Sequence, residues 1–138
     1  MGLFPVLPLY AAEFGATAAM VGFYMALVYI AITIGSLAVG WIPANVSRKA
    51  AFVVVAALGI PALVLLGRAT AFWQVVLCTA LIWFSGGFTT SLAGLFTGLI
   101  VEEKERGRSF SYMFLARPLA GIFGGAVVAW LVSWGGYR

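Results

Sequence analysis

The sequence contains no histidine and no aspartate, and it has a single cysteine, Cys78. Metal sites and catalytic dyads that need histidine or aspartate are therefore excluded. The acidic residues are all glutamates in short polar breaks, and none is placed in the middle of an apolar run. Cys78 lies inside an apolar run and has no second cysteine with which to form a disulfide within the chain. We therefore expect no enzyme activity, no metal and no cofactor.

Charge is also scarce, since only 9% of the residues are charged, against about a quarter in an ordinary soluble domain. Hydrophobic residues make up 64% of the chain, and the mean hydropathy is +1.10. The apolar residues come in runs of the length that a bilayer requires of a helix. This pattern predicts an all-α polytopic transmembrane helical bundle in a lipid bilayer. The net charge of +4 then reflects topology, and we expect no nucleic acid partner.

Polar breaks divide the sequence 1–138 into a partial first helix and about four full transmembrane helices, all in one amino-terminal bundle. The predicted spans are 2–12, which is partial, 17–41, 50–67, 71–101 and 109–134. As a helix, the first would reach only about 17 Å of a hydrocarbon core of about 30 Å. We therefore expect the chain to be a fragment whose first helix lacks its beginning.

Basic residues predict the orientation, because short loops rich in Lys and Arg stay on the cytoplasmic side. Most of the bases fall in loops 42–49 and 102–108, which we expect to be cytoplasmic. These bases are Arg48, Lys49, Lys104, Arg106 and Arg108, against only Arg68 and Arg138 on the other side. The predicted location is the membrane itself, most simply a bacterial inner membrane.

Small residues recur at every fourth position, which is the spacing at which transmembrane helices approach one another closely. They lie on the second, fourth and fifth spans, at Ser36 and Gly40, at Gly86, Thr90, Gly94 and Gly98, and at Gly121, Gly124 and Gly125. Two interpretations stay open. These faces either pack statically or slide past one another during transport.

Two charged residues admit a functional interpretation. Arg117 follows the second basic loop by about eight residues, which places it roughly 12 Å along the fifth span. A charge at that depth is costly unless it faces protein or water. Arg117 is therefore a candidate for an anionic-substrate or coupling contact, or else it snorkels back to the headgroups or pairs with the loop acids. Glu13 is either a solvated loop acid or a site of proton uptake.

The loop after the second span resembles the cytoplasmic signature of the major facilitator superfamily (MFS) of secondary transporters. Gly40 matches the first glycine of that signature, and Arg48 and Lys49 match its closing bases. The signature's aspartate, first base and second glycine fall here on Ala44, Asn45 and Ser47. The most diagnostic acid of the signature is thus absent.

The order of further features along the whole chain is also similar to this family. They are Leu7 to Tyr10 at the end of helix one, the turn Phe14 to Thr17, the segment Glu105 to Arg108, and Gly136, Tyr137 and Arg138 after helix five. The resemblance implies an MFS-like fold. It also implies that the cytoplasmic gate includes Gly40, Arg48, Lys49, Glu105, Arg106 and Arg108.

By the same resemblance, the expected function is secondary active transport of a small solute by alternating access, with the missing remainder of the chain supplying a second bundle. Proton-coupled efflux is the favoured direction. At two positions the sequence departs from the motifs of exporters in this family. Ile82 stands near the position of the coupling arginine of drug exporters, and Gly125 stands where antiporters have a proline. The alternative is a structural or assembly subunit that transports nothing and oligomerises through its small-residue faces.

Overall fold

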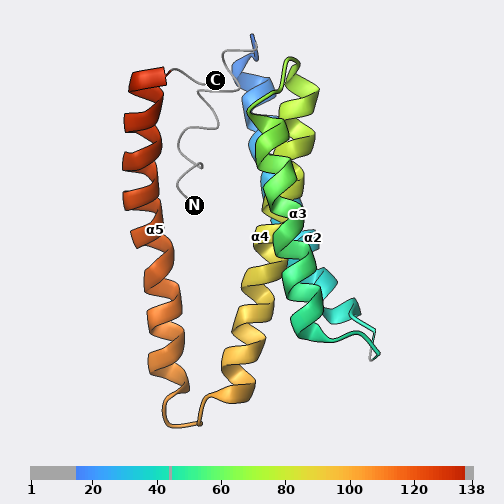
Figure 1. Ribbon diagram of the computed structural model, residues 1–138, viewed down its shortest axis with the longest axis vertical. Helices are drawn as coiled ribbons and strands as arrows, with labels where there is room; N and C mark the ends of the chain where they lie inside the picture. The colour runs from blue at the N-terminus through green and yellow to red at the C-terminus, as the bar shows by residue number, and fades with distance from the viewer. Residues whose placement is uncertain (1–14, 44, 136–138) are drawn as a thin grey trace.

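The computed structural model describes residues 15–43 and 45–135, with only the backbone at Arg117. Over these residues the chain forms α-helices joined by short turns and contains no strand (Figure 1). The elements are α2 (Ala18–Ala38), the 3-10 turn η1 (Val39–Trp41), α3 (Arg48–Leu66), α4 (Phe72–Ile100) and α5 (Arg106–Gly135). The predicted all-α class is confirmed. The predicted span 2–12, Glu13 and the features at 136–138 lie outside the described residues.

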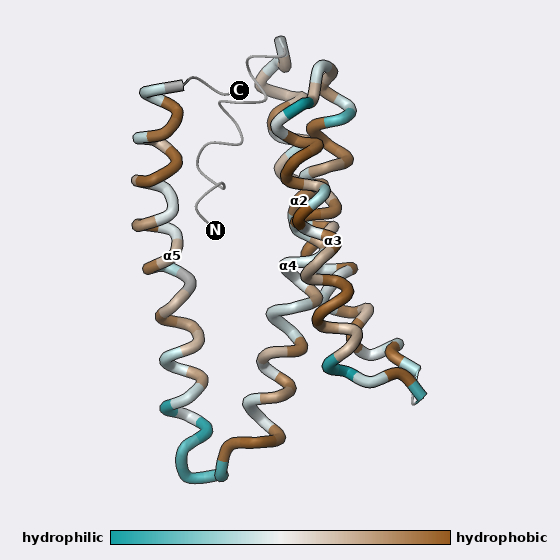
Figure 2. Tube along the Cα trace, in the orientation of Figure 1, coloured by the Kyte–Doolittle hydropathy of each residue, from teal (hydrophilic) through white to brown (hydrophobic). Residues whose placement is uncertain are grey.

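All four α-helices are long and apolar enough to cross a membrane. The helix α4 has 29 residues, so it extends about 43 Å, well beyond a hydrocarbon core of about 30 Å. Polar residues gather at the helix ends, as Figure 2 shows by colour. The chain is therefore an integral membrane protein by both its composition and its helix lengths.

Two helices begin earlier than the sequence predicts, and this corrects the assignment of their basic residues to loops. The helix α3 begins at Arg48 because Ser47 caps it, with the Ser47 hydroxyl accepting from the Ala50 N–H at 3.5 Å. Arg48 and Lys49 thus belong to a first helical turn. The helix α5 likewise begins at Arg106 instead of Ser109.

α3 also contains a proline in its interior. Pro61 has no amide hydrogen to donate to the carbonyl four residues earlier, and α3 is helical on both sides of it, from Arg48 to Leu66. Gly67 caps the carboxyl end of α3, and its N–H donates to the carbonyl of Leu63 at 3.2 Å. The side chain of Gln74 then closes the turn into α4 by accepting from the N–H groups of Thr70 and Ala71.

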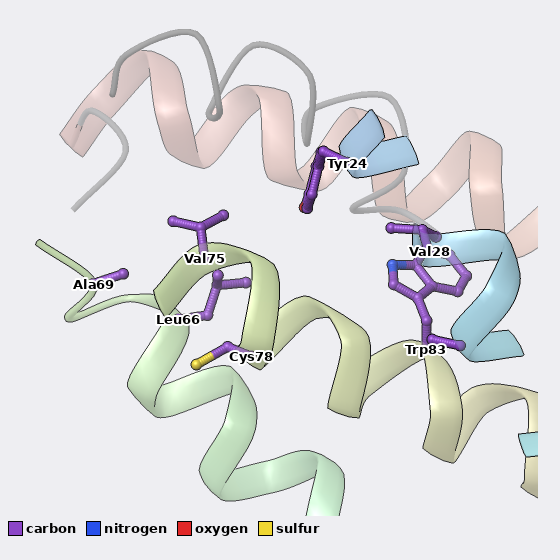
Figure 3. Close-up of a cluster of buried hydrophobic side chains, with 8 residues drawn as sticks. Tyr24, Val28, Leu66, Ala69, Val75, Cys78 and Trp83 are labelled. Atoms are coloured by element: carbon purple, nitrogen blue, oxygen red, sulfur yellow. The ribbon is translucent and has the colours of Figure 1, made fainter. Parts of the chain in front are cut away.

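The helices α2, α3 and α4 pack together, whereas α5 stands apart along most of its length (Figure 1). Their shared core lies near the α3–α4 turn, where side chains from all three elements meet (Figure 3). Its buried members are Tyr24, Val28, Ala31, Leu66, Ala69, Val75, Cys78 and Trp83. Since α4 buries residues against both neighbours, it is the central helix of this group.

The turns fall at two opposite ends of the molecule. The α2–α3 loop and the α4–α5 turn lie at the lower end in Figure 1, and the α3–α4 turn lies at the upper end. Arg48, Lys49, Arg106 and Arg108 therefore share one end, and Arg68 lies at the other. This is the distribution of charge on which the predicted topology depends.

Candidate functional site

The closest helix contact joins α2 to α4 through two glycines. A Cβ atom added at Gly35 would collide with the carbonyl oxygen of Phe84, and one added at Gly87 would collide with that of Ile32. The carbonyl carbons of Phe84 and Ile32 would lie only 2.9 and 3.0 Å from these Cβ atoms. The Ser36 hydroxyl donates to the carbonyl of Gly87 at 3.4 Å. Here backbone meets backbone, which is the contact that small residues permit between membrane helices.

A buried hydrogen bond between side chains ties the same two helices nearer their amino-terminal ends. The Tyr24 hydroxyl donates to the Thr79 hydroxyl oxygen at 2.9 Å, and both residues are 1% exposed. In a membrane the hydroxyls of an interface need such partners, because lipid chains offer none. Together with the glycine contact, this bond fixes both the register and the spacing of α2 against α4.

The structure places one of the small residues of the predicted helix-packing faces at this contact. Ser36 lies at the α2–α4 contact, but the two glycines that make it, Gly35 and Gly87, were missed. The spacing of the buried residues on α2 carried a usable signal: Tyr24, Val28, Ala31 and Gly35 follow one another at intervals of four, three and four. That is the 3.5-residue period of a helix seam.

The other selected glycines have different surroundings. A Cβ atom at Gly40, Gly86, Gly98 or Gly121 would meet nothing within 4 Å. One at Gly94 would lie 3.9 Å from side-chain atoms of Phe110 and Met113 on α5. The backbones at Gly124 and Gly125 lie in α5, where both residues are half-buried. Their role in helix movement stays a prediction.

A cavity of about 290 Å³ lies where three helices meet, and one predicted residue, Thr90, lines it. The lining residues are Phe52 from α3, Thr89, Thr90 and Ala93 from α4, and Met113 and Phe114 from α5. The Thr89 hydroxyl donates to the carbonyl of Ser85 at 2.8 Å, so its proton is already bound within the helix. This lining can enclose the apolar part of a small molecule and offer it a hydroxyl oxygen.

The cavity lies close to the basic end of the helices. Phe52 follows Arg48 by four residues and Met113 follows Arg106 by seven, which correspond to about 6 and 10 Å along the helices. Arg117 follows Met113 by four residues, one helical turn further into the span.

Local partners bind the basic residues at the start of α5. The Arg106 Nε donates to the carbonyl of Val101 at 3.1 Å, at the carboxyl end of α4. The Arg108 Nε donates to the Tyr112 hydroxyl at 3.0 Å, and its guanidinium lies 5.6 Å from the centre of that ring. Glu105 precedes this turn, and its carbonyl accepts from the Ser109 N–H at 3.0 Å.

The predicted gate residues form two separate groups. Gly40 lies in η1, and Arg48 and Lys49 begin α3, where Arg48 lines a second cavity of about 300 Å³ with Ile42, Pro43 and Val46. Glu105, Arg106 and Arg108 lie at the same end of the molecule but across it (Figure 1). The described structure does not bring the two groups together.

The family model described as Major Facilitator Superfamily matches residues 1–138. This confirms the resemblance seen in the order of sequence features. No curated protein matches the chain, and no solved structure matches it.

Proposed function

Since the chain belongs to the major facilitator superfamily, a family of membrane solute transporters, we propose that it moves a small solute by alternating access together with a second helical bundle. The observation that carries this proposal is the match to the family over the whole sequence, on a chain whose described residues form four helices of membrane-spanning length. The two bundles would rock about a solute held between them.

The cavity between α3, α4 and α5 supports a route that enters from the basic end. Its apolar lining suits the hydrocarbon part of a solute, and the hydroxyl of Thr89 or Thr90 suits a single polar contact. In the sequence Arg117 follows Met113, which lines the cavity, by four residues. We assign Arg117 the contact with an anionic group of the solute. A charged side chain within a transmembrane segment costs free energy, and such residues commonly mark substrate or ion pathways.

We further propose that loops 42–49 and 102–108 are cytoplasmic, that the membrane is a bacterial inner membrane and that transport is proton-coupled efflux. The shared end of the basic residues supports the sidedness. Gly40, Arg48, Lys49, Glu105, Arg106 and Arg108 then form the cytoplasmic gate. Because their two groups lie apart, each would close against the second bundle. Glu13 is proposed to exchange protons on the outer side.

Efflux of carboxyfluorescein, a fluorescent organic anion, from energised cells tests this function. We expect cells that express the protein to lose the dye faster than cells without it, and a protonophore to abolish the difference. Arg117→Ala should lower the initial rate at least about tenfold, in line with the loss of one charge-assisted contact of about 1.5–3 kcal/mol, whereas Arg117→Lys should retain part of it. Arg68→Ala, at the opposite end, serves as the matched control.

The outcomes separate the proposals. A normal rate for Arg117→Ala, at an equal amount in the membrane, would remove Arg117 from the mechanism. Equal dye loss with and without the protein would overturn anion efflux. It would favour the alternative, a non-transporting subunit that assembles through small-residue faces, and cross-linked homo-oligomers would support that alternative.

A further inference from the structure

The two basic segments at the lower end of the molecule differ in how their charge is balanced. Residues 102–108 contain Glu102, Glu103 and Glu105 beside three bases, so their charges cancel. Residues 42–49 contain Arg48 and Lys49 and no acid. All of the described glutamates lie in the α4–α5 turn, which Figure 1 places across the molecule from the α2–α3 loop. The positive charge of residues 42–49 therefore has no acid near it among the described residues.

The bases of the two segments also differ in their partners. Arg106 and Arg108 donate to Val101 and Tyr112, as described above. In the part of the chain that the structure describes, the Arg48 and Lys49 side chains take part in no hydrogen bond or ion pair, and both residues are exposed. Their charges are thus available to an external anion.

The cavity beside Arg48 has the form of an interfacial site. Its other lining residues are Ile42, Pro43 and Val46, and the neighbouring Trp41 is 80% exposed. The surface of this cavity is mostly polar, which suits a charged headgroup, and an exposed tryptophan next to two bases is typical of the boundary between headgroups and acyl chains. A ligand that fits this loop pocket combines an anionic head with a hydrocarbon tail.

We propose that the loop pocket, formed by Ile42, Pro43, Val46 and Arg48 with Lys49 beside it, binds an anionic phospholipid. Arg48 would bind two phosphate oxygens through its planar fork, and Lys49 adds a second charge. The acyl chain lies outside the cavity, against the exposed Trp41. The pocket lies at the end of two membrane-spanning helices, where lipid headgroups are in constant supply. This site shares Arg48 and Lys49 with the proposed cytoplasmic gate, but it depends neither on the identity of the solute nor on the direction of transport.

The matched pair Arg48→Gln/Lys49→Gln and Arg106→Gln/Arg108→Gln tests the site, because both remove two charges from the same end. The full protein is purified into nanodiscs of phosphatidylcholine, and the binding of added phosphatidylglycerol is measured by native mass spectrometry. Each base near an anionic surface contributes roughly fivefold to binding, so the loss of Arg48 and Lys49 should weaken it roughly 30-fold. The α5 variant should bind as the unchanged protein does.

Three results would overturn the proposal. Equal weakening in both variants would mean attraction to the surface charge as a whole. Unchanged binding in Arg48→Gln/Lys49→Gln would exclude the loop pocket. The single variant Lys49→Gln, which leaves Arg48 next to the Ser47 cap of α3, should show a smaller weakening of about fivefold. Displacement of the lipid by millimolar inorganic phosphate would identify a site for a soluble anion. Equal protection of Cys78 from a thiol-reactive dye shows that each variant is folded.

Discussion

The helices α4 and α5 are neighbours of nearly equal length, 29 and 30 residues, yet they relate to the rest of the molecule in opposite ways. α4 buries side chains against both α2 and α3, whereas none of the described side chains of α5 is buried. Both are apolar enough to cross a membrane. Apolar length therefore decides that a helix spans, but close backbone contact and paired hydroxyls decide which neighbour it packs against.

The largest expected effect comes from breaking the contact that α4 has and α5 lacks. Gly87→Leu should separate α2 from α4, because even its Cβ atom collides with the backbone of Ile32. Forced overpacking of this kind costs about 3 kcal/mol. The reaction of Cys78, buried in the shared core, with a thiol-reactive dye during heating should show a transition lower by roughly 10 °C.

Gly86→Leu is the matched control for this substitution, since a Cβ atom at the adjacent Gly86 meets nothing within 4 Å. Its transition should stay within about 2 °C of that of the unchanged protein. If both variants lost stability equally, the damage would come from leucine in the helix and not from the contact with α2.

A smaller effect is expected from the buried hydroxyl pair. Tyr24→Phe and Thr79→Val each remove one partner of the 2.9 Å bond, and hydrogen bonds between membrane helices contribute about 0.6 kcal/mol on average and up to about 1.7. The double variant should cost less than the sum of the two single ones, because the second substitution has no bond left to remove. Additive losses in the same dye assay would show that the two hydroxyls contribute separately.

The smallest effect on stability is expected on α5. Gly121→Ala adds a methyl group where nothing lies within 4 Å, so the free energy of unfolding should change by less than about 0.5 kcal/mol. Dye efflux gives the second measurement. A lower rate at unchanged stability would support movement along this face of α5 during transport, and unchanged values in both assays would count against it.

The sequence was sufficient for the class and the approximate bounds of the helices because polar breaks interrupt the apolar runs so sharply. Helix starts were less predictable. Arg48 and Arg106 were assigned to loops on account of their charge, but exposed basic residues are compatible with a first helical turn, and in α3 the Ser47 side chain caps that turn. Charge excludes a residue from hydrocarbon; it does not exclude it from a helix.

The two glycines of the helix contact were each missed by a single position. Gly86 was selected in place of Gly87, and Ser36 was selected without Gly35. Small residues at every fourth position define several overlapping faces on one helix, and only the neighbour decides which face is used. The cavity could not be predicted either, since Phe52, Thr89 and Met113 come from three helices whose arrangement is set by packing.

The residue numbers of the paired positions on α2 and α4 increase together, from Tyr24 with Thr79 to Ser36 with Gly87. The two helices therefore run in the same direction, and α3, which joins them in the sequence, must cross the membrane in the opposite direction. During biosynthesis α2 therefore enters the bilayer well before its partner, with 55 residues separating Tyr24 from Thr79. Until α4 arrives, the glycine face of α2 is open to any other helix at the insertion site. The α2–α4 contact can therefore form only once α3 and α4 have both crossed the membrane.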